Sequence, residues 1–338
     1  MSLPPVEIPL GAMRFNSDSQ KLEYFNGDLW FQVHTFNPDL NGGARGFVSG
    51  GAHPGTDKIE YVTIPIQSNA IEFGDLASTV KYCSGGSSNT RGVIGGGEEG
   101  STTDRIQYVT ISITGNATDF GNLTEALTYI SACSNQTRLV TGAGKNTPSN
   151  AKVNTCNYLT IASTGNAKDF GDLSQVRNNI GAVSNPTRGL FMGGYTPTSV
   201  NTMDFVTLAT LGNALDFGDL TRCIGYNSAQ CGSSTRGIVW GGQSPIAGGA
   251  GDKIDYFSFA TKGNTSVFGD STIDLKYRNC TSDTVRGVAG GGQSGPAARN
   301  TIEYITIATQ GNAFDFGDLT TDTHHASAAF SSGHGGLG

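Results

Sequence analysis

Two short motifs recur six times along this chain of 338 residues. The first is an arginine, usually followed by glycine, an apolar pair and further glycines, and it begins at Arg45, Arg91, Arg138, Arg188, Arg236 and Arg286. The second is Phe-Gly-Asp or Phe-Gly-Asn, and it begins at Phe73, Phe120, Phe170, Phe217, Phe268 and Phe316. Successive arginines are 46, 47, 50, 48 and 50 residues apart, and the phenylalanines 47, 50, 47, 51 and 48. Two independent markers with one period identify an internal repeat.

One repeat contains four segments with strand character and no helical period. In the second copy, RGVIGGG is an apolar run closed by glycines, typical of a buried inner strand. RIQYVTISIT is rich in β-branched residues, the segment around Phe120 follows a Gly-Asn turn, and the stretch through Tyr129 and Ile130 is the fourth. This pattern predicts an all-β fold: a six-bladed β-propeller of four-stranded antiparallel blades.

The two ends of the repeat array complement each other. The first copy starts at Arg45 without the strand that precedes the other arginines, and the last copy continues into DTHHASAAFSSG, which aligns with that strand. We expect residues 323–331 to pair with the strand that begins at Arg45, so that the C-terminal strand closes the ring and removes two exposed edges. The expected domains are a β-hairpin segment over 1–40 and the propeller over 41–338.

Composition excludes several partners and cofactors. The 49 glycines mark turns, and a net charge of −7 disfavours a nucleic-acid-binding surface. No run of about 18 apolar residues is present, so no membrane insertion is expected. The six cysteines form no CxxC pair and fall at different repeat offsets, which indicates reduced thiols rather than disulfides or a metal site. We expect no cofactor.

Residues present in every copy are architecture rather than a catalytic constellation. We therefore predict that the six repeat arginines are largely buried and donate to backbone carbonyls. An aromatic position, at Tyr61 in the first copy, is expected to pack blade against blade. The Phe-Gly-Asp aspartates are expected in turns rather than as calcium ligands. His324, His325 and His334 are expected to be exposed tail residues.

Recognition is expected where the copies differ, because loops on a rigid scaffold carry function. The connection after the glycines varies most, from AHPGTDK in the first copy to QSPIAGGAGDK in the fifth. All these connections are expected on one rim of the ring. The candidate binding residues on that rim are His53, Glu98, Glu99, Lys145, Tyr195, Gln243 and Gln293.

Both parts of the chain resemble known protein families. The repeat resembles a kelch-like propeller in its glycine pair and following aromatic, although the kelch tryptophan is absent, and units such as TRGVIGGG…IEYITIATQGNAFDFGDL resemble repeat proteins of phage genomes. The N-terminal stretch is similar to a short module of phage tail-fibre and appendage proteins, G-A-x-R-F-N-T-D, K-x-E-x-Y-N-G and W. The matching residues are Gly11, Ala12, Arg14, Phe15, Asn16, Asp18, Lys21, Glu23, Asn26, Gly27 and Trp30.

The resemblance implies a non-enzymatic bacteriophage virion structural protein, a tail fibre, baseplate protein or head appendage, assembled in the host cytoplasm. Trp30, Phe31 and Phe36 would then attach it to other virion proteins, and the propeller would bind a host cell-surface glycan or protein. The alternatives are a free carbohydrate-binding, lectin-like propeller and an enzyme built on the rim. The N-terminal module favours the first, since a free lectin needs no attachment hairpin, and no catalytic triad order is visible.

Overall fold

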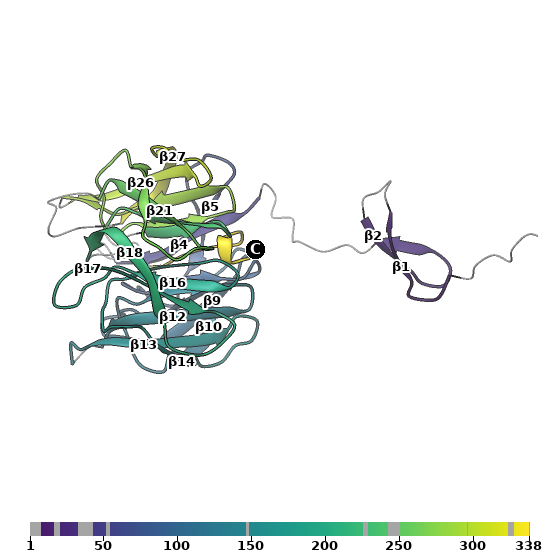
Figure 1. Cartoon of the computed structure of the whole chain (residues 1–338), viewed down its shortest axis with the longest axis horizontal. Coiled ribbons are helices and arrows are strands. Elements are labelled where there is room, and N and C mark those ends of the chain that lie inside the picture. Colours follow the sequence, from purple (N-terminus) through teal and green to yellow (C-terminus); the bar gives the residue numbers. More distant parts are fainter. Residues whose placement is uncertain are drawn as a thin grey trace, which may run out of the picture. The chain divides into compact units, whose positions relative to one another are not determined.

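The computed structural model describes residues 8–16, 21–32, 43–51, 55–146, 149–225, 229–242, 251–295, 297–323 and 328–337. The chain divides into two compact units, Met1–Asp39 and Leu40–Gly338, which we call unit 1 and unit 2. Both consist of strands, and the one short 3-10 helix among the described residues is η1 (Gly335–Leu337) (Figure 1). No helix in those residues has the length and apolarity needed to cross a bilayer.

Unit 1 is a three-stranded antiparallel meander, in keeping with the hairpins expected there. Its strands are β1 (Met13–Asn16), β2 (Lys21–Phe25) and β3 (Trp30–Gln32). The turn between β2 and β3 forms because the Asn26 side chain accepts hydrogen bonds from the backbone N–H groups of Asp28 and Leu29. Three short strands form a single layer and cannot enclose a core of their own.

Unit 2 contains six sheets among its described residues, and we call them repeat sheets 1 to 6. Sheet 1 consists of β28 (Ala328–Ser331), β4 (Arg45–Gly51), β5 (Thr56–Thr63) and β6 (Ile71–Asp75). Sheet 2 consists of β7 (Ser84–Ser87), β8 (Arg91–Gly95), β9 (Arg105–Thr110) and β10 (Thr118–Asn122). Sheet 3 consists of β11 (Ser131–Ser134), β12 (Arg138–Lys145), β13 (Lys152–Thr160) and β14 (Lys168–Asp172). Sheet 4 consists of β15 (Gly181–Ser184), β16 (Arg188–Met192), β17 (Val200–Thr207) and β18 (Leu215–Ile224). Sheet 5 consists of β19 (Ala229–Gly232), β20 (Arg236–Trp240), β21 (Lys253–Ser258) and β22 (Ser266–Asp270). Sheet 6 consists of β23 (Asn279–Ser282), β24 (Arg286–Gly290), β26 (Ala297–Thr306) and β27 (Phe314–Thr323), and the short β25 (Gln293–Ser294) also pairs with β26.

The strand order within a repeat sheet corrects the expected one. The arginine strand, predicted as the inner strand, is the second strand of its sheet. The first strand is the short segment before it, such as β11, which begins only after Tyr129 and Ile130. The stretch predicted as the fourth strand of one repeat therefore supplies the first strand of the next repeat sheet.

The C-terminal strand pairs with the beginning of the repeat array, as predicted. β28 runs antiparallel to β4, with Phe330 opposite Phe47 and the two rings stacked at 4.8 Å between centroids. Ser332 then exchanges bonds with Arg45: its backbone N–H donates to the Arg45 carbonyl, and its hydroxyl accepts from the Arg45 N–H, each at 3.0 Å. Ser88 and Arg91 make the same two bonds inside a covalent hairpin. The predicted start of the pairing segment was wrong, because Thr323 is the last residue of β27.

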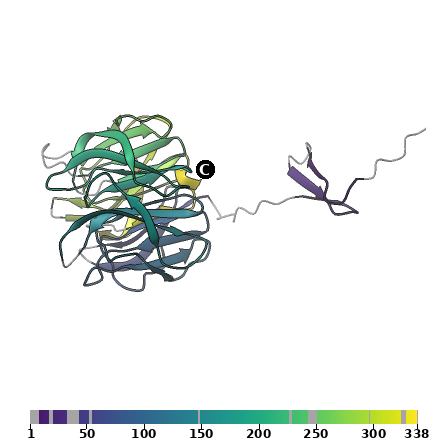
Figure 2. The same cartoon turned by 60° about the horizontal axis from the view of Figure 1, so that its bottom comes forward.

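The first strands of neighbouring sheets contact one another in a regular order. β7 contacts β28 and β11, β15 contacts β11 and β19, and β23 contacts β19 and β28. The two views in Figures 1 and 2 show the C-terminus against the body of unit 2, next to η1.

Three repeated side-chain bonds join each sheet to the next, and each continues from sheet 6 to sheet 1. The repeat arginines donate to a carbonyl just after the third strand of the next sheet: Ile111, Ile161, Leu208, Phe259, Ile307 and Ile64 in turn. The asparagine of the turn between the third and fourth strands accepts from a Phe-Gly-Asp/Asn backbone N–H of the preceding sheet. Five of these asparagines follow a glycine, namely Asn116, Asn166, Asn213, Asn264 and Asn312, and the sixth, Asn69, follows Ser68. A third-strand polar side chain accepts from the segment that follows that motif; these are Gln107, Asn157, Asp204, Asp255, Glu303 and Glu60.

The repeat arginines match the expectation in their hydrogen bonds but not in their burial. All six are only partly buried, and their guanidinium groups lie 4.4 to 5.3 Å from an aromatic ring of their own sheet. The same rings pack edge-on or tilted against the marker phenylalanine of that sheet, as Tyr61 does on Phe73. The aromatic position supports the arginine of its own sheet and also packs between sheets, as expected. Tyr61 lies against a core cluster that includes Val109 of sheet 2, and the Lys262 ammonium of sheet 5 lies 4.8 Å from the Phe205 ring of sheet 4.

Candidate functional site

The described residues of the variable connections lie at one end of the repeat sheets, which we call the loop end. The hairpins between first and second strands lie at the opposite end, which we call the hairpin end. Backbone bridges join Glu98 to Lys81, Lys145 to Thr128, Tyr195 to Asn178 and Gln293 to Lys276. Each bridge connects a candidate rim residue to the segment that leads into a first strand. Of the other rim candidates, Glu99 lies 3.5 Å from Arg105, and His53 and Gln243 fall outside the described residues.

Lys145, Lys152 and Tyr195 meet on this rim. Lys145 pairs with Lys152 across β12 and β13, and the Lys152 ammonium lies 4.3 Å from the centre of the Tyr195 ring. Burial and the neighbouring Lys145 charge lower the pKa of Lys152. The rim therefore carries a small basic patch in a chain of net negative charge.

Tyrosines that the sequence reasoning did not select lie beside the rim. Tyr82, Tyr129 and Tyr277 each occur nine residues after a marker phenylalanine, and each has a left-handed backbone conformation with φ of 56°, 56° and 57°. Asn179 occupies the same repeat position with φ of 54°. The recurrence of an aromatic residue at this offset could have identified these tyrosines from the sequence. Their unusual backbone conformation is visible only in the structure.

These residues are linked around the first strands. The Tyr129 backbone N–H donates to the Tyr82 carbonyl at 3.0 Å, and the Asn179 N–H donates to the Tyr129 carbonyl at 3.3 Å. The Tyr82 and Tyr129 rings stack at 4.2 Å between centroids. Burial is the main cause that raises the pKa of Tyr129, and interactions with Tyr82, Glu98 and Tyr277 raise this pKa further. The Tyr129 hydroxyl therefore stays protonated at neutral pH.

A polar cavity of about 70 Å³ lies among the first strands next to these tyrosines. At the loop end it is lined by Cys83, Ser84, Ile130, Ser131 and Asn279, each one or two residues from one of the tyrosines. The Asn279 amide nitrogen is buried and has no hydrogen-bond partner in the structure. The cavity therefore offers a donor that a ligand or a water can use.

A second cavity, of about 60 Å³, lies at the hairpin end. One residue from each of the six first strands lines both cavities, namely Gly85, Ala132, Ala182, Gln230, Cys280 and Ala329. The two spaces are thus neighbouring parts of one region enclosed by the first strands. Their lining differs, because the C-terminal turn occupies the hairpin end.

The C-terminal turn is held by His334, which corrects the expectation of an exposed tail residue. Its Nδ1 accepts from the Gly336 N–H at 3.1 Å, which leaves the ring proton on Nε2, 3.0 Å from the Ser87 carbonyl. Gly336 is buried, and a Cβ there would lie 2.0 Å from the Ser134 carbonyl oxygen, so only glycine fits this approach. His324 and His325 fall outside the described residues.

We predict that this histidine makes stability depend on pH. Burial lowers the pKa of His334 to about 4, below its ordinary 6.5, so the unfolded chain binds the extra proton first. The stabilisation is fully present above pH 6.5 and is lost as the pH falls towards 4. Relative to the variant His334→Gln, which keeps one donor and one acceptor without titrating, the parent should lose about 3 kcal/mol of unfolding free energy between pH 7 and pH 4.

Chemical denaturation of both proteins at the two pH values measures this difference. The carboxylates titrate alike in parent and variant and therefore cancel. Equal losses in the two proteins would contradict the assignment.

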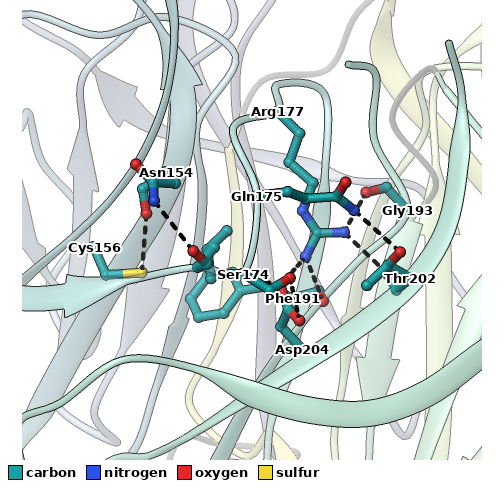
Figure 3. A network of polar contacts seen from close by, with 10 residues as sticks. Asn154, Cys156, Ser174, Gln175, Arg177, Phe191, Gly193, Thr202 and Asp204 are labelled. Atoms are coloured by element: carbon teal, nitrogen blue, oxygen red, sulfur yellow. Dashed lines mark hydrogen bonds and ion pairs between the residues drawn. The ribbon is translucent and has the colours of Figure 1, made fainter. Parts of the chain in front are cut away.

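Three buried ion pairs at non-repeat arginines are a further feature that the sequence reasoning missed. Arg177 and Arg278 lie between a fourth strand and the next first strand, and Arg222 lies near the end of the fourth strand β18; the three stand at different offsets from the marker phenylalanine. They pair with the third-strand carboxylates Asp204, Asp255 and Glu303. Arg177 donates to Asp204 at 2.6 Å and to the carbonyls of Gly193, Thr202 and Phe191 (Figure 3).

These pairs give the buried carboxylates structural partners. Burial alone would raise the pKa of Glu303, but Arg278 and the bonds from Thr272 outweigh it and hold the pKa below its usual value. Among the described residues, no three His, Cys, Asp or Glu side chains gather as they would around a metal ion. None of the six cysteines forms a disulfide, and five of them are buried.

The attachment residues proposed in unit 1 lie on different faces of its sheet. Trp30 is not an exposed residue: it is partly covered by Phe25 and by the Arg14 guanidinium, 4.1 Å from the ring centre. Phe31 lies on the other face and is 44% exposed. Phe36 falls outside the described residues.

The face that carries Phe31 is entirely apolar, and we call it the apolar face of unit 1. The strand register places five exposed side chains on it, namely Met13, Phe15, Leu22, Tyr24 and Phe31. On the opposite face the polar and aromatic side chains contact one another: the buried Glu23 accepts from Arg14 and Asn16, both at 2.9 Å, and Phe25 packs against Trp30. An apolar face without cover on a folded sheet indicates a surface for another molecule.

Comparison with known proteins adds no assignment: the chain matches no protein-family model and no curated protein.

Proposed function

We propose that unit 2 is a closed, six-bladed, kelch-like β-propeller and that the chain is a non-enzymatic structural protein of a bacteriophage virion. The six repeat sheets are its blades. Support for closure comes from the three inter-sheet bonds that run on from sheet 6 to sheet 1, as Arg286 does to Ile64. Because of these bonds, sheet 1 has the same contacts with its neighbours as every other sheet. In a linear array, the first and last sheets would each lack one neighbour.

In this proposal the two units divide the work of attachment and binding. The apolar face of unit 1 attaches the protein to another virion protein, and the loop end of unit 2 meets a host cell-surface glycan or protein. The observation that carries the proposal is the exposed apolar face of unit 1, because such a face on a small folded sheet indicates a surface for another molecule. Within unit 2, the rim residues Glu98, Lys145, Tyr195 and Gln293 lie at the loop end, opposite the start of β4. The N-terminal resemblance to phage-fibre modules supports a virion as the place of assembly.

A non-enzymatic role is supported by the partners of the buried charges. Asp204, Asp255 and Glu303 hold arginines and the preceding sheet. The His334 ring holds the C-terminal turn. These carboxylates and the His334 ring are therefore bonded to structural partners. This favours a binding role for the rim.

We predict that a chain beginning at Asp39 folds as a soluble monomer but fails to join particles. The full-length double variant Phe15→Ser/Tyr24→Ser should fail in the same way, because it replaces two side chains of the apolar face. Leu29→Ser is the matched control, since Leu29 is 65% exposed in a turn outside that face. Immunogold electron microscopy of purified particles with an antibody to unit 2 measures incorporation. Equal labelling with the truncated and full chains would disprove attachment through unit 1.

A further inference from the structure

We propose that Tyr82, Tyr129 and Tyr277 form a binding site for a neutral glycan at the loop-end mouth of the cavity between the first strands. The inference rests on the proposed binding role of unit 2 and gives it a location and a ligand class. None of the three belongs to the variable rim loops.

The backbone conformation at this position belongs to the repeat, but tyrosine is a costly residue for it. Asn179 shows that asparagine fits the same left-handed conformation in the same fold. Asparagine tolerates that conformation better than an aromatic residue does, for which the cost is about 1 kcal/mol or more. Three tyrosines at this position therefore add strain that the architecture does not require, and such strain is typical of ligand sites.

The tyrosines lie around one cavity although they come from distant sheets. Tyr82 precedes β7, Tyr129 precedes β11 and Tyr277 precedes β23. In the order of first-strand contacts, β11 and β23 are three steps apart in either direction, through β15 and β19 or through β7 and β28. The residues that follow them nonetheless line one cavity: Cys83 follows Tyr82, Ile130 follows Tyr129, and Asn279 lies two residues after Tyr277. The three tyrosines are therefore placed around the same cavity, and the rings of Tyr82 and Tyr129 are in contact.

The surroundings favour a neutral, hydroxyl-rich ligand. Tyrosine rings offer apolar faces on which the C–H surface of a sugar ring can lie, and their hydroxyls bond at the edge. Beneath them, Ser84, Ser131 and the unpartnered amide nitrogen of Asn279 provide neutral donors and acceptors. These groups suit the hydroxyls of a glycan.

Two other ligand classes fit less well. An anion would meet the Glu98 charge, which acts on Tyr129, and the cation that lines the cavity, Arg278, is already paired with Glu303. A quaternary ammonium ion needs aromatic faces separated by its own width, but the Tyr82 and Tyr129 faces stack on each other at 4.2 Å.

The test uses the full chain and the triple variant Tyr82→Asn/Tyr129→Asn/Tyr277→Asn. Saturation-transfer NMR with glucose, galactose and N-acetylglucosamine should show transfer from the parent to at least one sugar, and at least a tenfold weaker affinity for the triple variant. The thermal unfolding midpoint of the variant should equal or exceed that of the parent, because asparagine relieves strain. Phe314→Asn, at a 61% exposed aromatic residue at the start of β27 and outside the cluster, should bind as the parent does.

Four results would overturn the proposal: no transfer to any of the three sugars, equal binding by the triple variant, a lower unfolding midpoint of that variant, or transfer to choline in place of the sugars. Particle incorporation is measured separately by antibody labelling. Incorporation without sugar binding removes only the glycan site. Sugar binding by a chain that is absent from particles removes only the virion role.

Discussion

Removing residues 328–338 is expected to abolish cooperative folding of unit 2. The deletion takes away β28, exposes the whole edge of β4, and strips Phe47 of the Phe330 ring stacked on it. Phe330 is only 4% exposed, and loss of one such buried phenylalanine costs about 3 to 5 kcal/mol. Loss of the strand pairing adds to this, against a total domain stability of about 5 to 15 kcal/mol.

A shorter deletion separates the strand from the turn. Removing only residues 333–338 keeps β28 and the exchange between Ser332 and Arg45, and takes away the His334 turn. We expect this chain to unfold cooperatively with a lowered midpoint, whereas the longer deletion gives no sharp transition and aggregates through the open edge. Circular dichroism during heating and size-exclusion chromatography measure both effects. A sharp transition in the longer deletion would show that β28 is dispensable.

Replacing Arg177 by leucine is expected to destabilise unit 2 by about 3 to 5 kcal/mol, because it leaves the Asp204 carboxylate buried without a cation. Both side chains of this pair are fully buried, so water cannot compensate. The three carbonyls that accept from Arg177 lose their donor as well. Chemical denaturation of the single variant measures the loss.

The preceding repeat supplies the matched control. At the positions equivalent to Arg177 and Asp204 it has Leu127 and Asn157, and that pair is stable without a charge. The double variant Arg177→Leu/Asp204→Asn should therefore recover most of the stability that Arg177→Leu loses. The remaining deficit reports the bonds to the carbonyls. A double variant no more stable than Arg177→Leu would show that the ion pair is not the cause of the loss.

Much of the architecture could be predicted because it depends on local patterns that repeat. The arginine and phenylalanine markers give the period, and turn residues such as Gly115 and Asn116 separate the strands within each copy. The missing strand before Arg45 and the surplus segment after Phe316 predict the pairing of the two ends, and β28 lies on β4. The repeat arginines were also correctly expected to bond backbone carbonyls, because a planar group with five donors suits that role.

Two kinds of feature could not be predicted from the sequence. The first involves residues that do not recur at the same position of the repeat, and the second involves residues whose side of the sheet depends on strand pairing. Arg177, Arg222 and Arg278 stand at different offsets, so no repeat alignment shows that they reach equivalent carboxylates. The faces of Trp30 and Phe31 depend on strand register, which puts one beneath Arg14 and leaves the other exposed.

The sequence by itself determined the number of repeats, the strand content of each and the complementarity of the two chain ends, because these follow from local propensity and period. Only the tertiary structure decided that the segment before each arginine is the first strand, and that tyrosines from separate repeats are placed around one cavity. The physical reason is that this placement depends on hydrogen bonds between sheets, such as that from the Tyr129 N–H to the Tyr82 carbonyl, and on a left-handed backbone that no side-chain pattern encodes.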